Sequence, residues 1–265
     1  MLAGIHFQWI NDMGETLEKI LSMKKTFIGF IVPALLDKSL TNKGKDIFGR
    51  VYPEENYYPS WFVDALKQEA KNKNVIWAQE GFMHYCEPCF DVFEQNGGRE
   101  NHGYPDPFHE HVCLNGNSQT LEEQKSAIKK GKEMLMDLTG IIPEVYCPSN
   151  HLHNKNTLLA AKDGDFKEFT TRNLLPFGGL TSYKDSATGL RVFPESKIGE
   201  GKNSAIVYTF YDHLVSGKRE DYSKILSESD VEYLRFVDEP TKRVWLNQKM
   251  IMFSKKTRDW KRKFG

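Results

Sequence analysis

Val75-Ile76-Trp77-Ala78 is a short apolar run, and the residues Gln79-Glu80-Gly81-Phe82-Met83-His84 follow it directly. An apolar run rich in β-branched and aromatic residues is typical of a buried strand. The turn after it carries a carboxylate, Glu80, and an imidazole, His84. Both groups are common ligands of zinc and similar ions. We therefore expect a buried strand whose carboxyl end forms part of a metal site.

Further apolar runs of strand character alternate with helical patterns along the chain. Strands are expected at 3–10, 26–32, 75–78, 143–147 and 205–210, helices at 14–23, 59–71, 121–138 and 156–161, and a helix followed by a strand within 227–237. Strands separated by helices pair in parallel through right-handed crossovers, which leaves an α/β barrel or a doubly wound sheet. Our prediction is a single α/β domain, a distorted and incomplete barrel of parallel strands with outer helices.

The best helical pattern is 121–138. Its buried face is expected to contain Ala127, Met134, Leu135 and Leu138, with Lys and Glu on the opposite face. Thr139-Gly140 is expected to end it, because glycine commonly follows a helix.

The segment 87–119 interrupts the alternation of strands and helices. Its glycines, prolines and asparagines predict a long irregular loop, and long loops at the carboxyl end of a strand are often functional. We expect it to cover the substrate, with a structural or oligomer-contact role as the alternative. Cys86 and Cys89 have the spacing of half a zinc site, which Cys113, His109 and His111 could complete. Ordinary reduced cysteines are the simpler interpretation.

Composition limits the class of protein. The 265 residues contain 36 Lys and Arg and 36 Asp and Glu, so the net charge of zero argues against a general nucleic-acid-binding surface. The basic run 255–263 is a local exception that is expected to be a solvated tail. No apolar run approaches the length of a membrane span, and no signal peptide is visible, so a cytoplasmic location is expected.

Polar clusters follow four of the apolar runs. These clusters are Asn11-Asp12, Glu80 with His84, the stretch 147–151 and Asp212-His213. Both α/β barrels and doubly wound sheets place their sites at the carboxyl ends of parallel strands. The four clusters are therefore expected to converge on one site.

Three of these segments resemble the polysaccharide deacetylase superfamily, in its branch of small, divergent barrels. Ile10-Asn11-Asp12-Met13-Gly14 is similar to the branch's first strand ending, Ile-Asp-Asp-Val-Gly. Residues 80–84 stand where its metal-binding turn with two histidines would fall, and Pro148-Ser149-Asn150 resembles its substrate-groove segment. The resemblance covers most of residues 3–215.

The resemblance implies a role for each matched residue. Asp12, Glu80 and His84 would hold one divalent ion, with zinc expected and manganese or iron as alternatives. His213 would protonate the leaving group. Pro148, Asn150 and His151 would contact an acylated amino sugar or related carbohydrate. The implied activity is a metal-dependent hydrolase that removes an acyl group, with water as the nucleophile.

Two positions depart from the superfamily's pattern. Asn11 stands where the base aspartate belongs, and an amide cannot accept a proton. Glu80 stands where one metal histidine belongs, although glutamate is also a legitimate ligand. Loss of a general base commonly costs about 10²–10⁴ in rate. The alternative is therefore a catalytically impaired member of the fold that binds carbohydrate or a protein partner. A third interpretation is a glycosidase-like barrel in which Asp12 and Glu80 flank a glycosidic bond.

Simpler interpretations remain open for several of these residues. Asp12 could cap the following helix, and Pro148-Ser149-Asn150 could form only a turn. His109-Glu110-His111 could supply ligands, and Asp106 and Glu110 are candidate replacement bases if the loop folds over the site. Trp61 and Trp77 are expected in the core.

Overall fold

The computed structural model describes most of the first 210 residues and a few positions beyond them. The described residues are 2–7, 14–22, 24–39, 57–95, 109–114, 116–174, 182–198, 204–210, 229, 244, 246–251 and 253.

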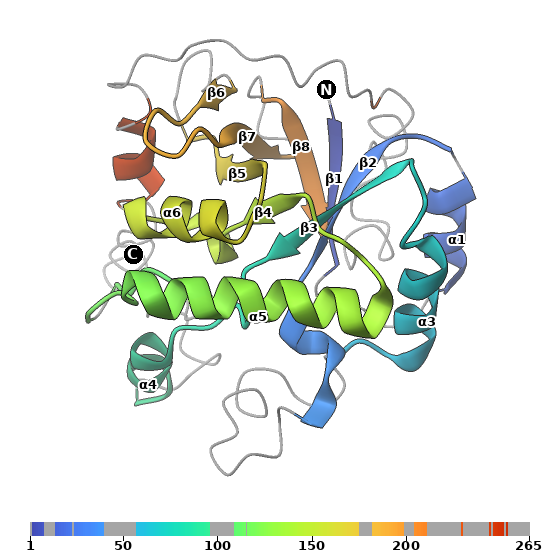
Figure 1. Ribbon diagram of the computed structural model, residues 1–265, viewed down its shortest axis with the longest axis horizontal. Helices are drawn as coiled ribbons and strands as arrows, with labels where there is room; N and C mark the ends of the chain where they lie inside the picture. The colour runs from blue at the N-terminus through green and yellow to red at the C-terminus, as the bar shows by residue number, and fades with distance from the viewer. Residues whose placement is uncertain are drawn as a thin grey trace, which may run out of the picture.

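The centre of the molecule is a closed barrel of seven parallel strands (Figure 1). The strands are β1 (Leu2–His6), β2 (Phe27–Ile31), β3 (Val75–Glu80), β4 (Val145–Cys147), β5 (Glu168–Arg172), β7 (Arg191–Lys197) and β8 (Ile206–Phe210). They pair in the order β5-β4-β3-β2-β1-β8-β7, and a β5–β7 pairing closes the ring. The predicted α/β barrel of parallel strands is confirmed, and its ring has seven strands. The short strand β6 (Tyr183–Lys184) pairs antiparallel to β7 outside the ring.

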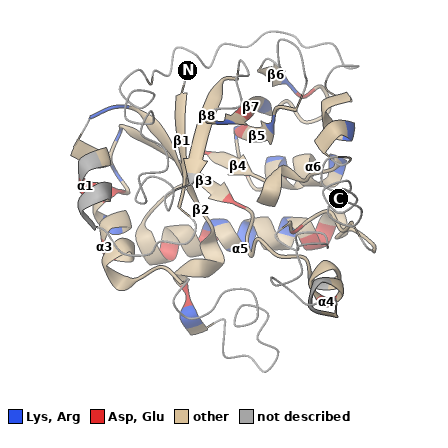
Figure 2. Cartoon of the chain, turned by 180° about the vertical axis from the view of Figure 1, so that it is seen from behind, with Lys and Arg blue, Asp and Glu red and all other residues tan. Residues whose placement is uncertain are grey.

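Helices cover the outside of the barrel. They are α1 (Gly14–Ser22), α3 (Ser60–Glu69), α4 (Glu87–Gln95), α5 (Leu121–Thr139) and α6 (Lys155–Asp163), with short 3-10 turns η1 (Pro33–Leu36) and η5 (Ser149–His151). Figure 2 shows charged residues spread along α5, whereas most of the strand surface carries none. None of the described helices combines the length and apolar character that a membrane span requires.

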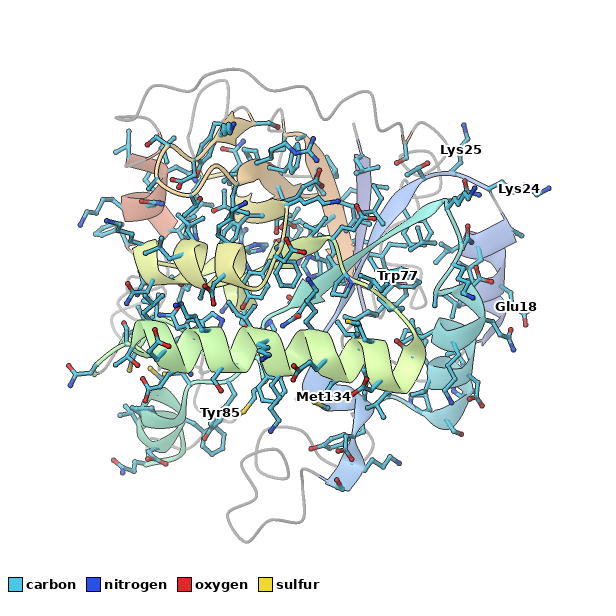
Figure 3. The ribbon with its side chains drawn as sticks, viewed as in Figure 1. Glu18, Lys24, Lys25, Trp77, Tyr85 and Met134 are labelled. Atoms are coloured by element: carbon cyan, nitrogen blue, oxygen red, sulfur yellow. The ribbon has the colours of Figure 1, made fainter. Side chains whose placement is uncertain are left out.

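The strands alternate between the two faces of the barrel wall. Trp77 lies on the outer face, 5% exposed, in a cluster that also holds Leu66 of α3 and Leu135 of α5 (Figure 3). Trp61 is partly buried against the same cluster, so both tryptophans contribute to the core as expected. Another cluster is drawn from strand residues alone and therefore fills the interior: Leu2, Ile28, Phe30, Ala78, Val145, Cys147, Phe193 and Ile206.

Helix α5 has well-defined ends, but its buried face differs from the expected one. Thr120 and Glu123 form a capping box, and Gly140 ends the helix with a φ of 77°. Leu135 is fully buried, but Leu138 is 39% exposed. The buried face also includes Gly131, because the Gln79 side chain of β3 approaches so closely that a Cβ there would lie 2.3 Å from its Nε2. Ala127 and Met134 are partly buried against the same core cluster as Leu135, so of the four expected residues only Leu138 lies outside the buried face.

The segment 87–119 is less irregular than expected, because it begins with helix α4. Pro88 lies in the first turn, where proline is tolerated since the amide there has no partner within the helix. Residues 96–108 and 115 lie outside the described residues. The remaining part, 109–114 and 116–119, leads into α5.

Candidate functional site

Four ionisable side chains form the carboxyl-end layer of the barrel. His6, Glu80 and Cys147 are the last residues of β1, β3 and β4, and Glu195 lies on β7. Glu80 and Cys147 are register partners on neighbouring strands. His6 and Glu80 are at most 3% exposed, and Cys147 and Glu195 are fully buried. Parallel strands thus bring together groups that are up to 189 positions apart in the sequence.

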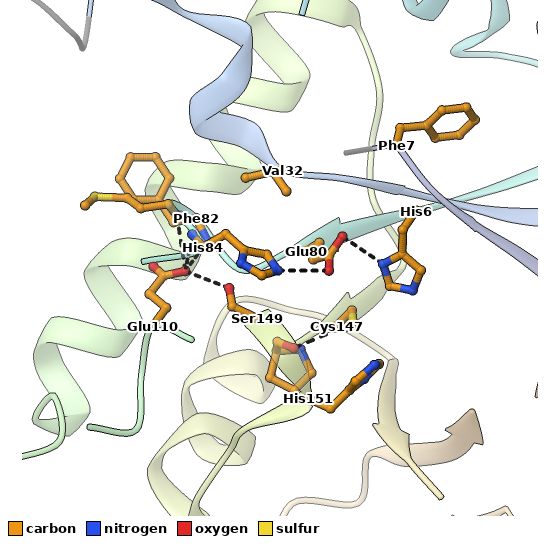
Figure 4. A network of polar contacts seen from close by, with 12 residues as sticks. His6, Phe7, Val32, Glu80, Phe82, His84, Glu110, Cys147, Ser149 and His151 are labelled. Atoms are coloured by element: carbon orange, nitrogen blue, oxygen red, sulfur yellow. Dashed lines mark hydrogen bonds and ion pairs between the residues drawn. The ribbon is translucent and has the colours of Figure 1, made fainter. Parts of the chain in front are cut away.

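Glu80 and Glu195 lie on the two nitrogen-bearing sides of the His6 ring. Nδ1 of His6 is 2.9 Å from Oε2 of Glu80, and Nε2 is 3.4 Å from Oε2 of Glu195. The second oxygen of Glu80 is 3.2 Å from Nε2 of His84. Glu80 therefore lies between two imidazoles (Figure 4). The His6 ring also stacks on Phe30, with centroids 4.1 Å apart, which fixes its plane.

These contacts set the charge of the layer. Burial alone lowers the pKa of His6, but the negative charge of Glu80 and hydrogen bonds with Glu195 and Glu80 outweigh burial and raise that pKa to about 9. Burial alone raises the pKa of Glu80, but attraction to His6 and hydrogen bonds from His6 and His84 hold it well below its usual range. At neutral pH a His6 cation therefore lies beside the Glu80 anion.

A second set of contacts involves Cys147, His151 and Glu195. Their ligand atoms lie within 4.8 Å of one another, and all three residues are buried. Nδ1 of His151 and Sγ of Cys147 each lie 3.7 Å from Oε1 of Glu195. Burial and the nearby Glu195 charge raise the pKa of the Cys147 thiol. A nucleophilic cysteine needs the opposite shift, so these surroundings do not activate Cys147 for nucleophilic attack.

The turn after β3 is held in place by Glu110. Its Oε2 accepts hydrogen bonds from the backbone N–H groups of Phe82, Met83 and His84 at 2.7, 3.1 and 3.2 Å. The hydroxyl of Ser149 donates to the same oxygen at 3.1 Å. Glu110 therefore positions the turn. Because this oxygen already accepts four hydrogen bonds, Glu110 is not arranged to act as the replacement base that the sequence suggested.

Glycine is required at position 81 of this turn. Gly81 has a φ of 55°, a conformation that residues with a Cβ rarely adopt. A Cβ there would lie 2.0 Å from the Ser149 hydroxyl and 2.5 Å from the Glu110 carboxylate. The missing side chain thus allows Glu110 and Ser149 to reach the turn that carries His84.

Backbone strain is concentrated near the same layer. His84, Asn150 and His151 have φ values of 55°, 54° and 60°, although none is a glycine. Such conformations cost about 1–3 kcal/mol each and persist where surrounding contacts enforce them. Two of the three residues are the histidines that contact Glu80 and Glu195, which is the pattern expected of a site shaped for binding or catalysis.

The structure places some of the predicted site residues and not others. Glu80 and His84 are 3.2 Å apart, as a shared site requires. Pro148 and Asn150 follow β4, beside His151. The predicted residues Asn11, Asp12 and His213, together with Asp106, lie outside the described residues, as does the basic run 255–263.

The motif His109-Glu110-His111 does not act as one metal-binding unit. The ring of His111 hydrogen-bonds to Gln119 at 2.8 Å and to the hydroxyl of Tyr146. Nε2 of His109 instead points to Sγ of Cys89, at 3.2 Å. The two histidines therefore have separate environments.

Three residues of the carboxyl-end layer, His6, Cys147 and Glu195, were not predicted as site residues, although Cys147 begins the polar stretch 147–151. His6 lies within an apolar strand, and the two-residue period places it on the interior face with Leu2 and Gly4, a signal that could have identified it. Glu195 lies on β7, which was not predicted because Pro194 precedes it and proline usually argues against a strand.

No protein-family model matches the sequence, and no curated protein is similar to it in sequence. Solved structures of low similarity include the de-N-acetylase from Aggregatibacter actinomycetemcomitans, with 10% identity, a TM-score of 0.42 and coverage of 66% of this chain and 63% of that one. The Bc1960 peptidoglycan N-acetylglucosamine deacetylase has 15% identity, a TM-score of 0.41 and coverage of 91% and 86%. The α-amylase AmyC from Thermotoga maritima has 10% identity, a TM-score of 0.41 and coverage of 74% and 45%.

Deacetylases of the kind that the sequence resembles are thus among the structural neighbours, and so is an α-amylase. The chain spans less than two thirds of the length of the first and third of these proteins. At these identities and TM-scores the function has to be argued from the site itself.

Proposed function

We propose that this protein is a metal-dependent hydrolase that removes an acyl group from an amino sugar or a related carbohydrate. One observation carries the proposal: acid–base and metal-ligating side chains from four different strands converge, buried, at the carboxyl end of a parallel barrel. This end is where barrels of this kind place their active sites. The substrate class comes from the resemblance of the sequence to carbohydrate deacetylases.

The donor set of Cys147, His151 and Glu195 fits a divalent ion. Thiolate, imidazole and carboxylate are the three side-chain types that bind zinc, and three protein ligands leave one position open. The ligand atoms already lie within 4.8 Å of one another. An ion bound there would polarise an acyl carbonyl and lower the pKa of a water molecule. Asp12, Glu80 and His84 are the ligand set proposed from the sequence, and metal content distinguishes the two sets.

In the proposed hydrolysis, the pair Glu80 and His84 transfers the protons. Hydrolysis of an amide takes a proton from the attacking water and delivers one to the departing nitrogen. Histidine most often performs such transfers, and a carboxylate on its other side orients the ring and stabilises its cation. In this site Glu80 holds His84 through Oε1 and His6 through Oε2. His213 is the alternative proton donor that the sequence resemblance implies, and Asn11 would then orient water rather than accept its proton.

Substrate contact is proposed for Pro148 and Asn150. Both lie between Cys147 and His151, in a turn whose backbone is strained at Asn150. The half-buried Asn150 carries an amide that can donate to and accept from sugar hydroxyls.

The test is acetate release from N-acetylglucosamine oligomers, with protein supplied with zinc or manganese. We expect turnover by the wild type and a loss of about 10²–10⁴ in kcat for Glu80→Gln and His84→Gln. The matched control is Glu133→Gln, which removes an exposed carboxylate of α5 and should behave as the wild type.

Metal content of the same preparations tests the ligand set. Glu195→Gln should lower metal content if Cys147, His151 and Glu195 hold the ion, whereas His84→Gln should do so if the set inferred from the sequence is correct. Sugar binding by calorimetry without acetate release, in the presence of every metal tried, would overturn the hydrolase proposal in favour of a carbohydrate-binding role.

A further inference from the structure

A second cluster of metal-ligating side chains lies beside the carboxyl-end layer. Cys86 follows the β3 turn, Cys89 lies in the first turn of α4, and Cys113 and His109 come from the segment before α5. The three sulfur atoms lie within 4.8 Å of one another. Sγ of Cys89 is 3.7 Å from Sγ of Cys113 and 3.2 Å from Nε2 of His109. Two chain segments that are 20 positions apart, measured from Cys89 to His109, thus meet through four potential ligands.

The Cys89–Cys113 separation matches that between two sulfurs of a tetrahedral zinc site, and the Cys89–His109 separation is close to that between a sulfur and a nitrogen. With Zn–S bonds of about 2.3 Å, neighbouring sulfurs in such a site lie about 3.8 Å apart, and sulfur and nitrogen about 3.5 Å. A disulfide would instead need sulfurs about 2.05 Å apart. The spacing Cys-x-x-Cys followed by a distant ligand pair is also that of structural zinc sites. A disulfide would use two of the three sulfurs and would leave the third sulfur and the imidazole of His109 without a role.

From this geometry we propose that Cys86, Cys89, Cys113 and His109 bind one structural zinc ion. Four protein ligands close the coordination shell, which is the mark of a structural site rather than a catalytic one. Cys86, Cys89 and His109 are buried, and Cys113 is half-buried. The inference does not depend on the proposed hydrolase activity.

The position of the cluster indicates which contact a bound ion would stabilise. Cys86 lies two residues after His84, and His109 immediately precedes Glu110, whose carboxylate holds the backbone of residues 82–84. The ion would therefore fix both partners of that contact, the turn and the carboxylate. The segment 109–114 has only two aliphatic side chains: Val112, which is 4% exposed, and Leu114, which is partly buried in the same small cluster. A metal clamp would provide the stability that such a segment cannot gain from packing.

Backbone hydrogen bonds hold Cys113 in position. Its backbone N–H donates to the Ser118 hydroxyl at 3.2 Å, and the N–H of Gln119 donates to the carbonyl of His111 at 3.1 Å. These bonds close the loop after Cys113.

The first experiment is cobalt substitution of the full chain, read by absorption. Three thiolates on Co²⁺ should give intense sulfur-to-cobalt charge-transfer bands in the wild type. Cys147→Ser should retain them, because its sulfur belongs to the other group, while Cys89→Ser and Cys113→Ser should lose most of the intensity. Absence of these bands from the folded wild type, or their retention in Cys89→Ser, would overturn the proposal.

Thiol protection provides a measurement that needs no variant. Cys86, Cys89 and Cys113 should resist alkylation in the zinc-loaded native protein and become reactive when a chelator is added, whereas Cys147 should stay protected by its burial in the barrel. A disulfide between Cys89 and Cys113, seen by mass spectrometry and released only by a reductant, would contradict the zinc site. Loss of metal in Glu195→Gln with intact cobalt–thiolate bands would show that the two metal sites are independent. Failure of one proposal would therefore not contradict the other.

Discussion

The two ends of the barrel interior are built from the same strands but have opposite chemistry. Near the amino ends the interior is apolar, with Leu2, Ile28 and Ile206 in one cluster. At the carboxyl ends His6, Glu80 and Glu195 replace apolar side chains although they are equally buried. Burying ionisable groups costs free energy unless they are paired, and here each contacts an oppositely charged or hydrogen-bonding partner. The comparison separates a part of the interior that stabilises the fold from a part to which we assign the proposed chemistry.

The largest effect is expected from Glu80→Ala, at the carboxyl end. It leaves the His6 and His84 rings without the carboxylate that both contact, and breaking a buried pair costs about 3–5 kcal/mol. Acetate release should also fall by about 10²–10⁴. Chemical denaturation and steady-state assays measure the two effects. Unchanged activity in this variant would remove Glu80 from the chemistry.

Ile28→Ala is the matching change at the apolar end. Ile28 is 1% exposed, and deleting its side chain should lower the free energy of unfolding by about 2–5 kcal/mol. Activity per folded molecule should be unchanged, measured at a temperature where the variant remains folded. The control is Ile142→Ala, since Ile142 is 64% exposed. A specific loss of activity in Ile28→Ala would show that the two ends are not separate in function.

The pH dependence of stability should report the His6 contacts. Because the pKa of His6 rises from 6.5 to about 9 on folding, its stabilising contribution is present below pH 6.5 and is lost as the pH rises through 9. The contribution is about 3 kcal/mol from that difference in pKa. Denaturation with a chelator present, between pH 6 and 9, should show this decline in the wild type. His6→Gln should give a flatter profile, and an equal slope in both proteins would contradict the assignment.

Ser149→Ala should have the smallest effect of the series. It removes one of four donors to the Glu110 oxygen, and a hydrogen bond to a charged group contributes about 1.5–3 kcal/mol at most. Three backbone donors remain, so we expect a loss near 1 kcal/mol. A modest rise in KM with kcat retained would indicate that the turn is only slightly displaced.

The sequence predicts the fold best where strands carry strong apolar patterns. β1, β2, β3 and β8 and the helices α3, α5 and α6 lie where expected, within a few residues. β5 and β7 were missed because one reads Glu-Phe-Thr-Thr-Arg and the other contains Pro194, patterns that resemble loops. These two strands pair with each other and close the seven-stranded ring.

The residues of the candidate site likewise divide into those on clearly predicted strands and those that are not. Glu80 and His84 could be identified because they follow a clear strand. Glu195 was missed together with its strand, and the role of Glu110 could not be read from the sequence because it depends on a contact with residues 82–84 across 26 or more positions. From the sequence alone, the grouping of Cys89 with Cys113 and His109 was one of several possible ligand combinations. The structure places these three residues in contact.

The most direct test of the central claim is acetate release from an N-acetylglucosamine oligomer by the full chain, followed by NMR. The protein is first stripped of metal and then reconstituted with zinc or manganese. The account predicts no release from the stripped protein, turnover after reconstitution, and little turnover by reconstituted Glu80→Gln. Reconstituted wild type that binds the oligomer without releasing acetate would contradict it.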